Sequence, residues 1–256
     1  MKALALVLLL GCGSKERPRR EHRRTEVATE SAPAKKSFTP SSAAPATPGP
    51  VPGCQGTSID PPSQVIDRAG ELFQGGEPIK AVNMMHELAK AHPQSATVRA
   101  KLGALLVHTN PPHLDQAIPS FEDALRLHDD GCRLSEEDEF QTLNALTNAY
   151  MDKGEFAPAV PWLRRAIVRW PASGTMHYNL ACALCMTHDR EGCMRELTVS
   201  LEASNGPPPP LLEGRAPPAW HYAKLAADDP DLASVRGDPR FRALVARFPE
   251  PATPPQ

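Results

Sequence analysis

Aromatic side chains are scarce in this sequence. Phe, Trp and Tyr together make up 5% of the 256 residues. A β-sandwich fills the space between its sheets with β-branched and aromatic side chains, so this composition argues against one. A core built mainly from Ala, Leu and Val suits closely packed helices, and we expect an all-α protein.

The sequence also lacks a strong net charge and any recognisable catalytic motif. Its formal net charge of −2 gives no overall signature of nucleic-acid binding. No Gly-rich phosphate loop follows a strand pattern, and no nucleophile elbow surrounds a serine. We therefore expect a protein that is not an enzyme, with no catalytic residue, no cofactor, no bound metal and no nucleic-acid partner.

Long hydrophobic runs are missing as well. Residues 3–10 are continuously apolar after Lys2. Such a run is shorter than the ~20 residues that a helix needs to cross a bilayer core, but it fits the apolar region of a signal peptide. Leu9-Leu10-Gly11-Cys12 follows and resembles a bacterial lipobox. The resemblance implies that residues 1–11 are a signal peptide and that Cys12 is the lipidation site.

A basic segment at residues 15–24 complicates this interpretation, because positive charge directly after an apolar run resists translocation. After lipidation the same charges would attract anionic headgroups. We expect a lipid-anchored protein of the bacterial envelope. Gly13 is not the Asp that retains lipoproteins at the inner membrane in enteric-type sorting, which favours the outer membrane, facing the periplasm. The alternative is a cytosolic protein with a basic tail.

Residues 12–61 contain the expected lipidated cysteine, the basic segment and then a stretch rich in Pro, Ala and Ser. Such a composition buries too little apolar surface to offset the entropy of ordering the chain. We expect a disordered linker that holds the following domain away from its anchor.

Residues 62–205 show helical periodicity with a repeat of about 34 residues. In the clearest unit, Leu146 and Tyr150 precede Gly154, and the small residues Ala159 and Ala166 follow. The pattern resembles the tetratricopeptide repeat (TPR), a helical hairpin with small residues where its two helices touch. The resemblance implies about four hairpins stacked into a right-handed superhelix.

The C-terminal part has two further features. Residues 206–218 are rich in proline, which predicts a loop. Residues 219–249 contain Asp229-Pro230 and Asp238-Pro239, and each pair is expected to start a helix, over 230–235 and 239–248. This stretch resembles a segment that closes bacterial TPR arrays, so we expect it to cap the last hairpin, with a disordered tail at 250–256.

A concave groove is implied by the TPR resemblance, lined by the first helix of each hairpin. The repeat alignment places these candidate peptide-binding residues along it: His108, Gln141, Asn144, Asn148, Asp152 and Tyr178. The amides of Asn144 and Asn148, four residues apart on one helix face, could pair with the backbone of an extended peptide. The alternative is that both are ordinary solvated residues. We expect a scaffold for an unidentified protein or peptide in an envelope complex.

The cysteines of the last hairpin allow three interpretations. Cys182, Cys185 and Cys193 lie within 17 residues that also contain His177 and His188, which is compatible with a zinc or thiol site. Buried cysteines that act as small hydrophobic residues are the simplest interpretation. A disulfide between Cys185 and Cys193 is the third, since they face each other across the turn and export would allow oxidation.

Overall fold

The computed structural model describes Cys54 and residues 60–251. Cys12, the expected signal peptide, most of the expected linker and residues 252–256 lie outside the described residues. None of the described helices is long and apolar enough to cross a membrane.

The described part of the chain contains α-helices and short 3₁₀ turns and no β-strand. The α-helices are α1 (Ser63–Gln74), α2 (Pro78–Ala91), α3 (Ala96–His108), α4 (Leu114–Asp129), α5 (Glu136–Asp152), α6 (Phe156–Arg169), α7 (Gly174–Met186), α8 (Arg190–Ser204), α9 (Ala219–Asp228) and α10 (Pro239–Ala246). The 3₁₀ turns are η1 (Pro210–Leu212) and η2 (Pro230–Leu232). The predicted all-α class is confirmed.

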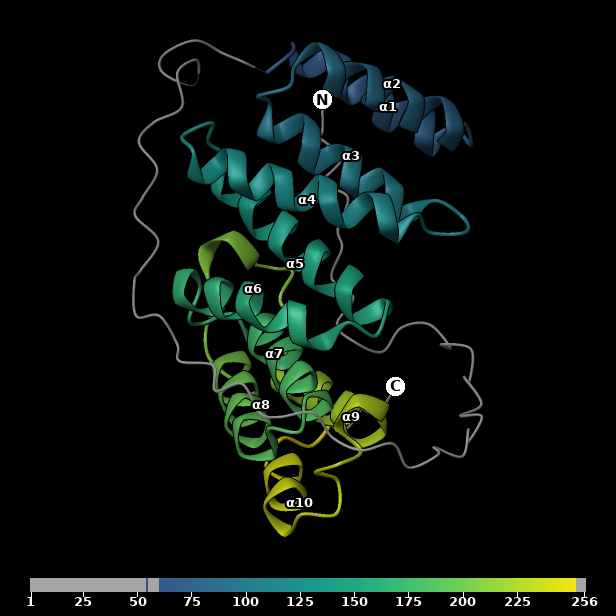
Figure 1. The fold of residues 1–256 in the computed structure, drawn as a ribbon. Helices are drawn as coiled ribbons and strands as arrows, with labels where there is room; N and C mark the ends of the chain where they lie inside the picture. The colour runs from purple at the N-terminus through teal and green to yellow at the C-terminus, as the bar shows by residue number, and fades with distance from the viewer. Residues whose placement is uncertain (1–53, 55–59, 252–256) are drawn as a thin grey trace, which may run out of the picture.

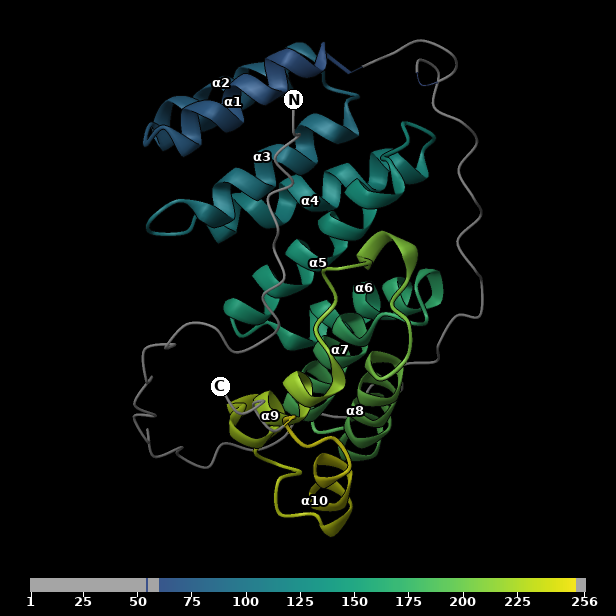
Figure 2. The ribbon, with the colours of Figure 1, turned by 180° about the vertical axis from the view of Figure 1, so that it is seen from behind.

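The first eight helices form four hairpins that stack in sequence order. Each odd-numbered helix packs on the helix that follows it, and α2, α4 and α6 each pack on the first helix of the next hairpin. Figures 1 and 2 show the resulting array, with α1 and α2 at one end and α10 at the other. The predicted array of four hairpins is therefore confirmed.

Local sequence fixes where the hairpins begin and turn. The side chains of Ser95, Ser135 and Ser173 each accept a hydrogen bond from the backbone N–H three residues later, which caps the first turn of α3, α5 and α7. Inside two hairpins, Gly76 and Gly154 adopt positive φ angles of 83° and 77°. These turns need the left-handed conformation that glycine reaches without steric penalty.

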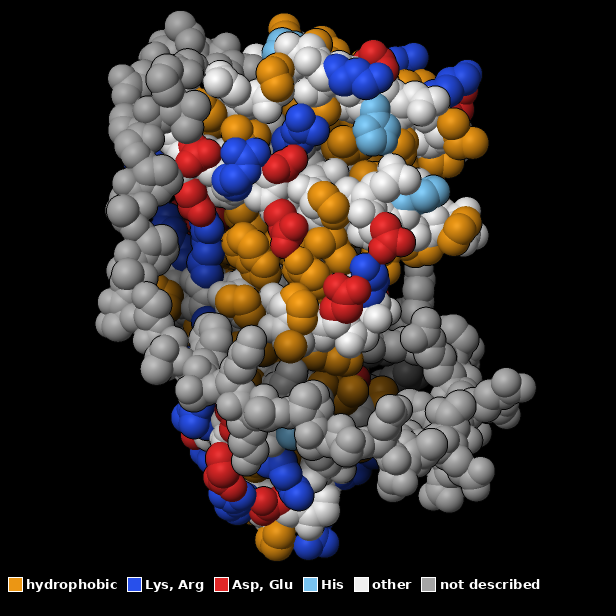
Figure 3. Space-filling view, in the orientation of Figure 1, with side chains coloured by type: hydrophobic (Ala, Val, Ile, Leu, Met, Phe, Trp, Pro, Cys, Tyr) orange, Lys and Arg blue, Asp and Glu red, His pale blue; other side chains and the backbone are white. Residues whose placement is uncertain are grey.

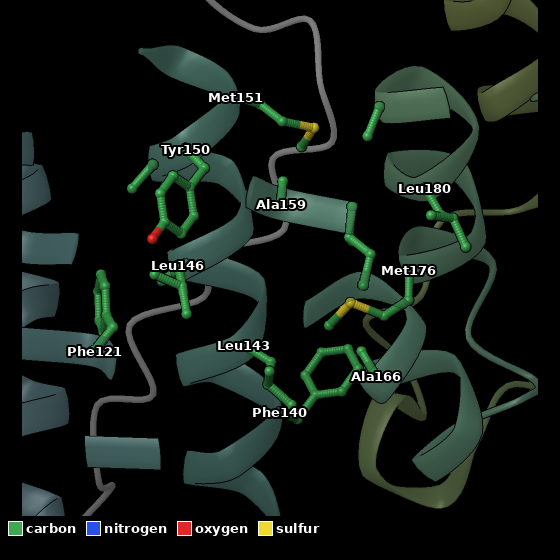
Figure 4. Close-up of a cluster of buried hydrophobic side chains, with 14 of the residues drawn as sticks. Phe121, Phe140, Leu143, Leu146, Tyr150, Met151, Ala159, Ala166, Met176 and Leu180 are labelled. Atoms are coloured by element: carbon green, nitrogen blue, oxygen red, sulfur yellow. The ribbon is translucent and has the colours of Figure 1, made fainter. Parts of the chain in front are cut away.

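Small side chains let the paired helices approach, and large ones fill the space between hairpins. Ala159, Leu163 and Ala166 on α6 are completely buried. Figure 4 shows Ala159 and Ala166 within a cluster of larger side chains from α4, α5 and α7. In this cluster the ring of Phe140 meets the buried Trp170 ring edge-on, with centroids 5.0 Å apart. This packing places α3, α5 and α7 beside one another along the array.

The C-terminal segment closes the array. α9 packs on α8, and η2 packs on α7. Asp229 and Asp238 cap η2 and α10, each accepting a hydrogen bond from the backbone N–H two residues later. The expected helix over 230–235 was wrong: the chain forms only the 3₁₀ turn Pro230–Leu232, because the N–H groups of Ala233 and Val235 bond to carbonyls three residues back and not four.

The proline-rich segment between α8 and α9 folds back onto the array. Leu212 in η1 is 1% exposed. The Arg215 guanidinium donates to the Glu137 carboxylate at 2.9 Å, near the start of α5. The segment is therefore held to the array by an apolar contact at Leu212 and a charged contact at Arg215.

The segment before α1 is also attached. A disulfide joins Cys54 to Cys132, which follows α4. The carboxylate of Asp60 accepts hydrogen bonds from the hydroxyls of Ser95 and Thr97 at the start of α3. The end of the expected linker is thus fixed to the array before the first helix begins.

Candidate functional site

Three asparagines meet where α5 and α7 lie side by side. The side-chain amide of Asn179 donates to Oδ1 of Asn148 at 3.2 Å and to Oδ1 of Asn144 at 3.4 Å. Asn179 is completely buried, and its Oδ1 has no hydrogen-bond partner in the described part of the chain. We call Asn144, Asn148 and Asn179 the amide cluster. Leaving a buried acceptor without a hydrogen bond costs free energy, so a further donor at this place would be stabilising.

The other predicted groove residues differ in how far they are exposed. Gln141 and Asn148 on α5 are partly buried, and Asp152 at the end of α5 is exposed. His108, at the end of α3, is also partly buried. The accessible part of the predicted groove, the row of candidate residues on the first helices of the hairpins, therefore runs along α5 and reaches the end of α3.

Asn144 and Tyr178 are not open to a partner, contrary to the sequence-based expectation. Asn144 is 1% exposed and Tyr178 is fully buried. The Tyr178 hydroxyl donates to Oδ2 of Asp229 at 2.9 Å, and its ring lies 5.2 Å from that of Tyr222. The C-terminal segment thus covers the stripe on α7, because the cap folds over the first helix of the last hairpin.

A carboxyl group lies at the centre of this covered region. Asp229 accepts from Tyr178 and from the thiol of Cys182, whose sulfur is 3.7 Å away. Burial raises the pKa of the Asp229 carboxyl, and these hydrogen bonds partly oppose the effect. One ligand atom each from Cys182, Asp229 and Asp231 lies within 4.8 Å of the others. The hydrogen bonds of Asp229 give this cluster a structural role in holding the cap.

The five His and Cys residues of the last hairpin do not gather at one point among the described residues. Cys185 and Cys193 form a disulfide across the turn. His177 lies between Glu196, with Nδ1 2.8 Å from a carboxylate oxygen, and the carbonyl of Pro171. His188 is exposed in the turn, with a φ of 70° in the place that glycine takes in two other hairpins.

The acidic residues near the start of α5 are largely paired. Arg165 on α6 makes two hydrogen bonds to the Asp129 carboxylate, at 2.7 and 2.8 Å, and one to Glu139 at 3.3 Å. Glu136 accepts from the indole of Trp170 at 3.2 Å. These charges tie neighbouring hairpins together, so they are part of the framework.

Sequence reasoning missed Asn179 as a site residue. It lies next to Tyr178, which the repeat alignment placed on the groove, and its amide faces the Asn144–Asn148 pair. The signal was present as a third asparagine near the same repeat position.

No protein-family model matches this sequence, and no curated protein does. Similar solved structures include a MamA RS-1 ArsTM double mutant, at 13% identity and a TM-score of 0.49, with 75% of this chain and 95% of that chain covered. YrrB, described as a TPR protein with an unusual peptide-binding site, is 17% identical with a TM-score of 0.49, covering 72% of this chain and 80% of its own. MamA from residue 41 to its end, from Desulfovibrio magneticus RS-1, is 13% identical with a TM-score of 0.48, covering 75% and 95%. Likeness at this level does not say what this chain binds.

Proposed function

We propose that this protein is a non-enzymatic scaffold of the bacterial cell envelope, anchored by a lipid on Cys12, that binds a protein or peptide along α5. The amide cluster is the observation that carries the binding part of this proposal. Primary amides both donate and accept hydrogen bonds, as does the backbone of an extended peptide. Asn148, the partly buried member, brings such an amide to the accessible edge of the cluster, and its Oδ1 is held there by the buried amide of Asn179.

A partner would reach the cluster at Asn148, because this member is only partly buried. Gln141 and Asp152 lie one to two turns away on either side along α5 and add polar groups to the same helix. An extended segment lying along α5 would pass all three. The accessible length is shorter than the expected groove, since the cap occupies the stripe on α7.

The anchoring part of the proposal rests on the N-terminal sequence and on the disulfides. Disulfides persist in oxidising compartments outside the cytosol. The structure contains the pairs Cys54–Cys132 and Cys185–Cys193, which supports export. The runner-up, a cytosolic adaptor with a basic tail, would leave both pairs reduced.

Binding is tested in the native cell by placing a photo-crosslinking amino acid at position 148 and, as control, at Asn83 on the outer helix α2. We expect position 148 to give a discrete crosslinked product that position 83 does not give. Asn148→Ala should weaken capture of that partner at least tenfold, with the helical circular-dichroism signal unchanged. Equal crosslinking from both positions would contradict binding along α5.

Anchoring is tested separately with Cys12→Ser, membrane fractionation and palmitate labelling. We expect the variant to lose the label and to leave the membrane fraction or to remain unprocessed. A variant that stays labelled and membrane-bound would rule out Cys12 as the anchor. The result does not depend on the outcome of the crosslinking experiment.

A further inference from the structure

A groove separates α8 from α10 at the closed end of the array. Its volume is about 580 Å³, and it is open to solvent along one side. The apolar part of its lining comes from both helices: Met194 and Thr198 on α8, and Ala243 and Leu244 on α10. Met194 and Leu244 are 6% and 5% exposed, so they form the floor. A hollow of this size fits within the range of sites that hold a ligand or an anchoring side chain.

The rim of the groove is basic. Arg195, Arg240 and Arg247 line it together with a single acidic residue, Glu191. Figure 3 shows Lys and Arg side chains gathered with acidic ones over the end of the molecule formed by α8 and α10. The lining itself therefore holds more basic than acidic groups, and acidic partners just outside it, Asp238, Glu196 and Glu202, contact the three arginines.

Two of the three arginines have donors to spare. Arg240 is occupied, with two hydrogen bonds to Glu191 at 2.7 and 3.0 Å and three to Asp238 at 2.8, 3.2 and 3.3 Å. Arg247 gives a long hydrogen bond to Glu202 at 3.3 Å, and its guanidinium carbon lies 5.4 Å from the centre of the Phe248 ring. Within residues 60–251, Arg195 makes a 3.4 Å contact with Glu196, whose carboxylate is already held by a shorter bond to His177. A guanidinium carries five N–H donors, so Arg195 and Arg247 can each receive a carboxylate.

The geometry points to a docking site for an acidic, amphipathic segment of a partner protein, on a surface separate from α5. The segment would place an apolar side chain on Met194 and Leu244, and its Asp or Glu side chains on Arg195 and Arg247. The free guanidinium donors favour a segment with acidic side chains, and the apolar floor favours one with an apolar side chain that can be buried there. This inference is independent of the peptide site on α5.

An anionic membrane is the other ligand that a basic surface attracts, and the groove favours it less. The buried apolar floor between the arginines suits an apolar side chain, which a lipid headgroup does not offer. Arg240, at its centre, is also neutralised by Glu191 and Asp238, which would weaken attraction to a charged bilayer.

The test measures fluorescence anisotropy of the full chain in nonionic detergent with a labelled peptide of twelve residues that alternates Glu with Leu and Phe. A twin peptide with Lys for every Glu is the control ligand. We expect the acidic peptide to bind, the basic twin not to bind, and the affinity to fall as salt is raised from 50 to 300 mM. The double variant Arg195→Gln/Arg247→Gln should weaken binding at least tenfold. Arg133→Gln/Arg164→Gln, which changes exposed arginines elsewhere, should leave it unchanged.

A second pair of variants tests the apolar floor. Ala243→Trp fills the groove from an exposed position, whereas Ala246→Trp adds the same side chain to α10 away from the lining. We expect the first to abolish peptide binding and the second to leave it intact. Equal binding by all four variants would overturn the proposal. A second result would also overturn it: the wild-type protein does not bind the peptide, and the Arg195→Gln/Arg247→Gln variant binds phosphatidylglycerol vesicles more weakly than the wild type does. That result would identify a membrane contact instead.

Discussion

α1 and α7 both begin a hairpin, yet the array buries them to very different degrees. In α1 the buried set consists of Ala69, whereas in α7 it runs without a break from Gly174 to Cys185. The difference follows from neighbours: α7 contacts α5, α6, α8 and η2, while α1 contacts only α2 and α3 among the elements with extensive packing. The first helix of a hairpin can thus be nearly a surface helix or a core helix, depending on whether other elements pack on both sides of it.

Removing the two disulfides should have the largest effect on the free energy of unfolding. The two bonds differ in the length of chain that they enclose. Cys54 and Cys132 are 78 residues apart, and Cys185 and Cys193 are 8 apart. In the chain-entropy model the first stabilises by about 4 to 5 kcal/mol and the second by about 2 to 3 kcal/mol. We therefore expect Cys54→Ser/Cys132→Ser to lower the free energy of unfolding more than Cys185→Ser/Cys193→Ser.

Urea unfolding of the three oxidised proteins measures this difference, with non-reducing peptide mapping to establish the pairs. The wild-type protein under reducing conditions serves as the control for loss of both bonds. A larger loss from the short pair would show that local geometry outweighs loop length.

Truncation of an aromatic ring at each end should give the next largest effect. Tyr222 is 1% exposed, and its hydroxyl lies 2.6 Å from that of Thr175 on α7. We expect Tyr222→Ala to destabilise the closed end by about 3 to 5 kcal/mol. Phe73→Ala in α1 should remove about 1 to 2 kcal/mol, because that ring is only partly buried.

Hydrogen exchange resolves the two ends separately, which matters because a repeat array can unfold in parts. Protection should fall in α7 and α9 for Tyr222→Ala, and in α1 and α2 for Phe73→Ala. A uniform loss over the whole array in both variants would mean that the ends are coupled more tightly than this comparison assumes.

Glycine-to-alanine changes should lower the stability of the closed end and raise that of the α1 end. A Cβ on Gly174 would stand 3.0 Å from the backbone oxygen of Ser200 and would collide with the Ser204 side chain. We expect a loss of about 1 to 3 kcal/mol from this overpacking. A Cβ on Gly70 in α1 meets nothing within 4 Å, so Gly70→Ala should stabilise by about 0.5 to 1 kcal/mol. Thermal unfolding of both variants measures the sign, and a loss at Gly70 would show that α1 is more crowded than the structure indicates.

The smallest expected effect is a change in pH dependence at the closed end. Burial raises the pKa of Asp229, so the folded protein holds a proton there over a range in which the unfolded chain has lost it. Stability from this group is therefore complete at low pH and is lost as pH rises through the raised pKa. Asp229→Asn should flatten this part of the curve while keeping an acceptor for the Tyr178 hydroxyl. Urea unfolding from pH 4 to pH 8 measures the slope, with Asp228→Asn, an exposed neighbour, as control.

The sequence was sufficient for the repeat framework because small residues at Ala81, Ala117 and Ala159 recur at a fixed place in the first three hairpins. The covering of Tyr178 could not be predicted, since it depends on how a separate C-terminal segment folds back over α7. The Cys54–Cys132 pair was missed for a similar reason: one cysteine lies in a stretch of linker composition, and nothing local shows that it meets the end of α4. Periodicity reports contacts within and between neighbouring repeats, whereas these contacts join segments far apart in the chain.

The bond between Cys54 and Cys132 also has a mechanical consequence. With a lipid on Cys12, a pull from the membrane would travel along the linker to Cys54 and cross the disulfide to the junction between α4 and α5. The load would bypass α1 to α4, which lie inside the closed covalent ring. The sparsely buried α1 would then be shielded from tension, and the protein would be held by the middle of its array, with its closed end free to turn toward a partner.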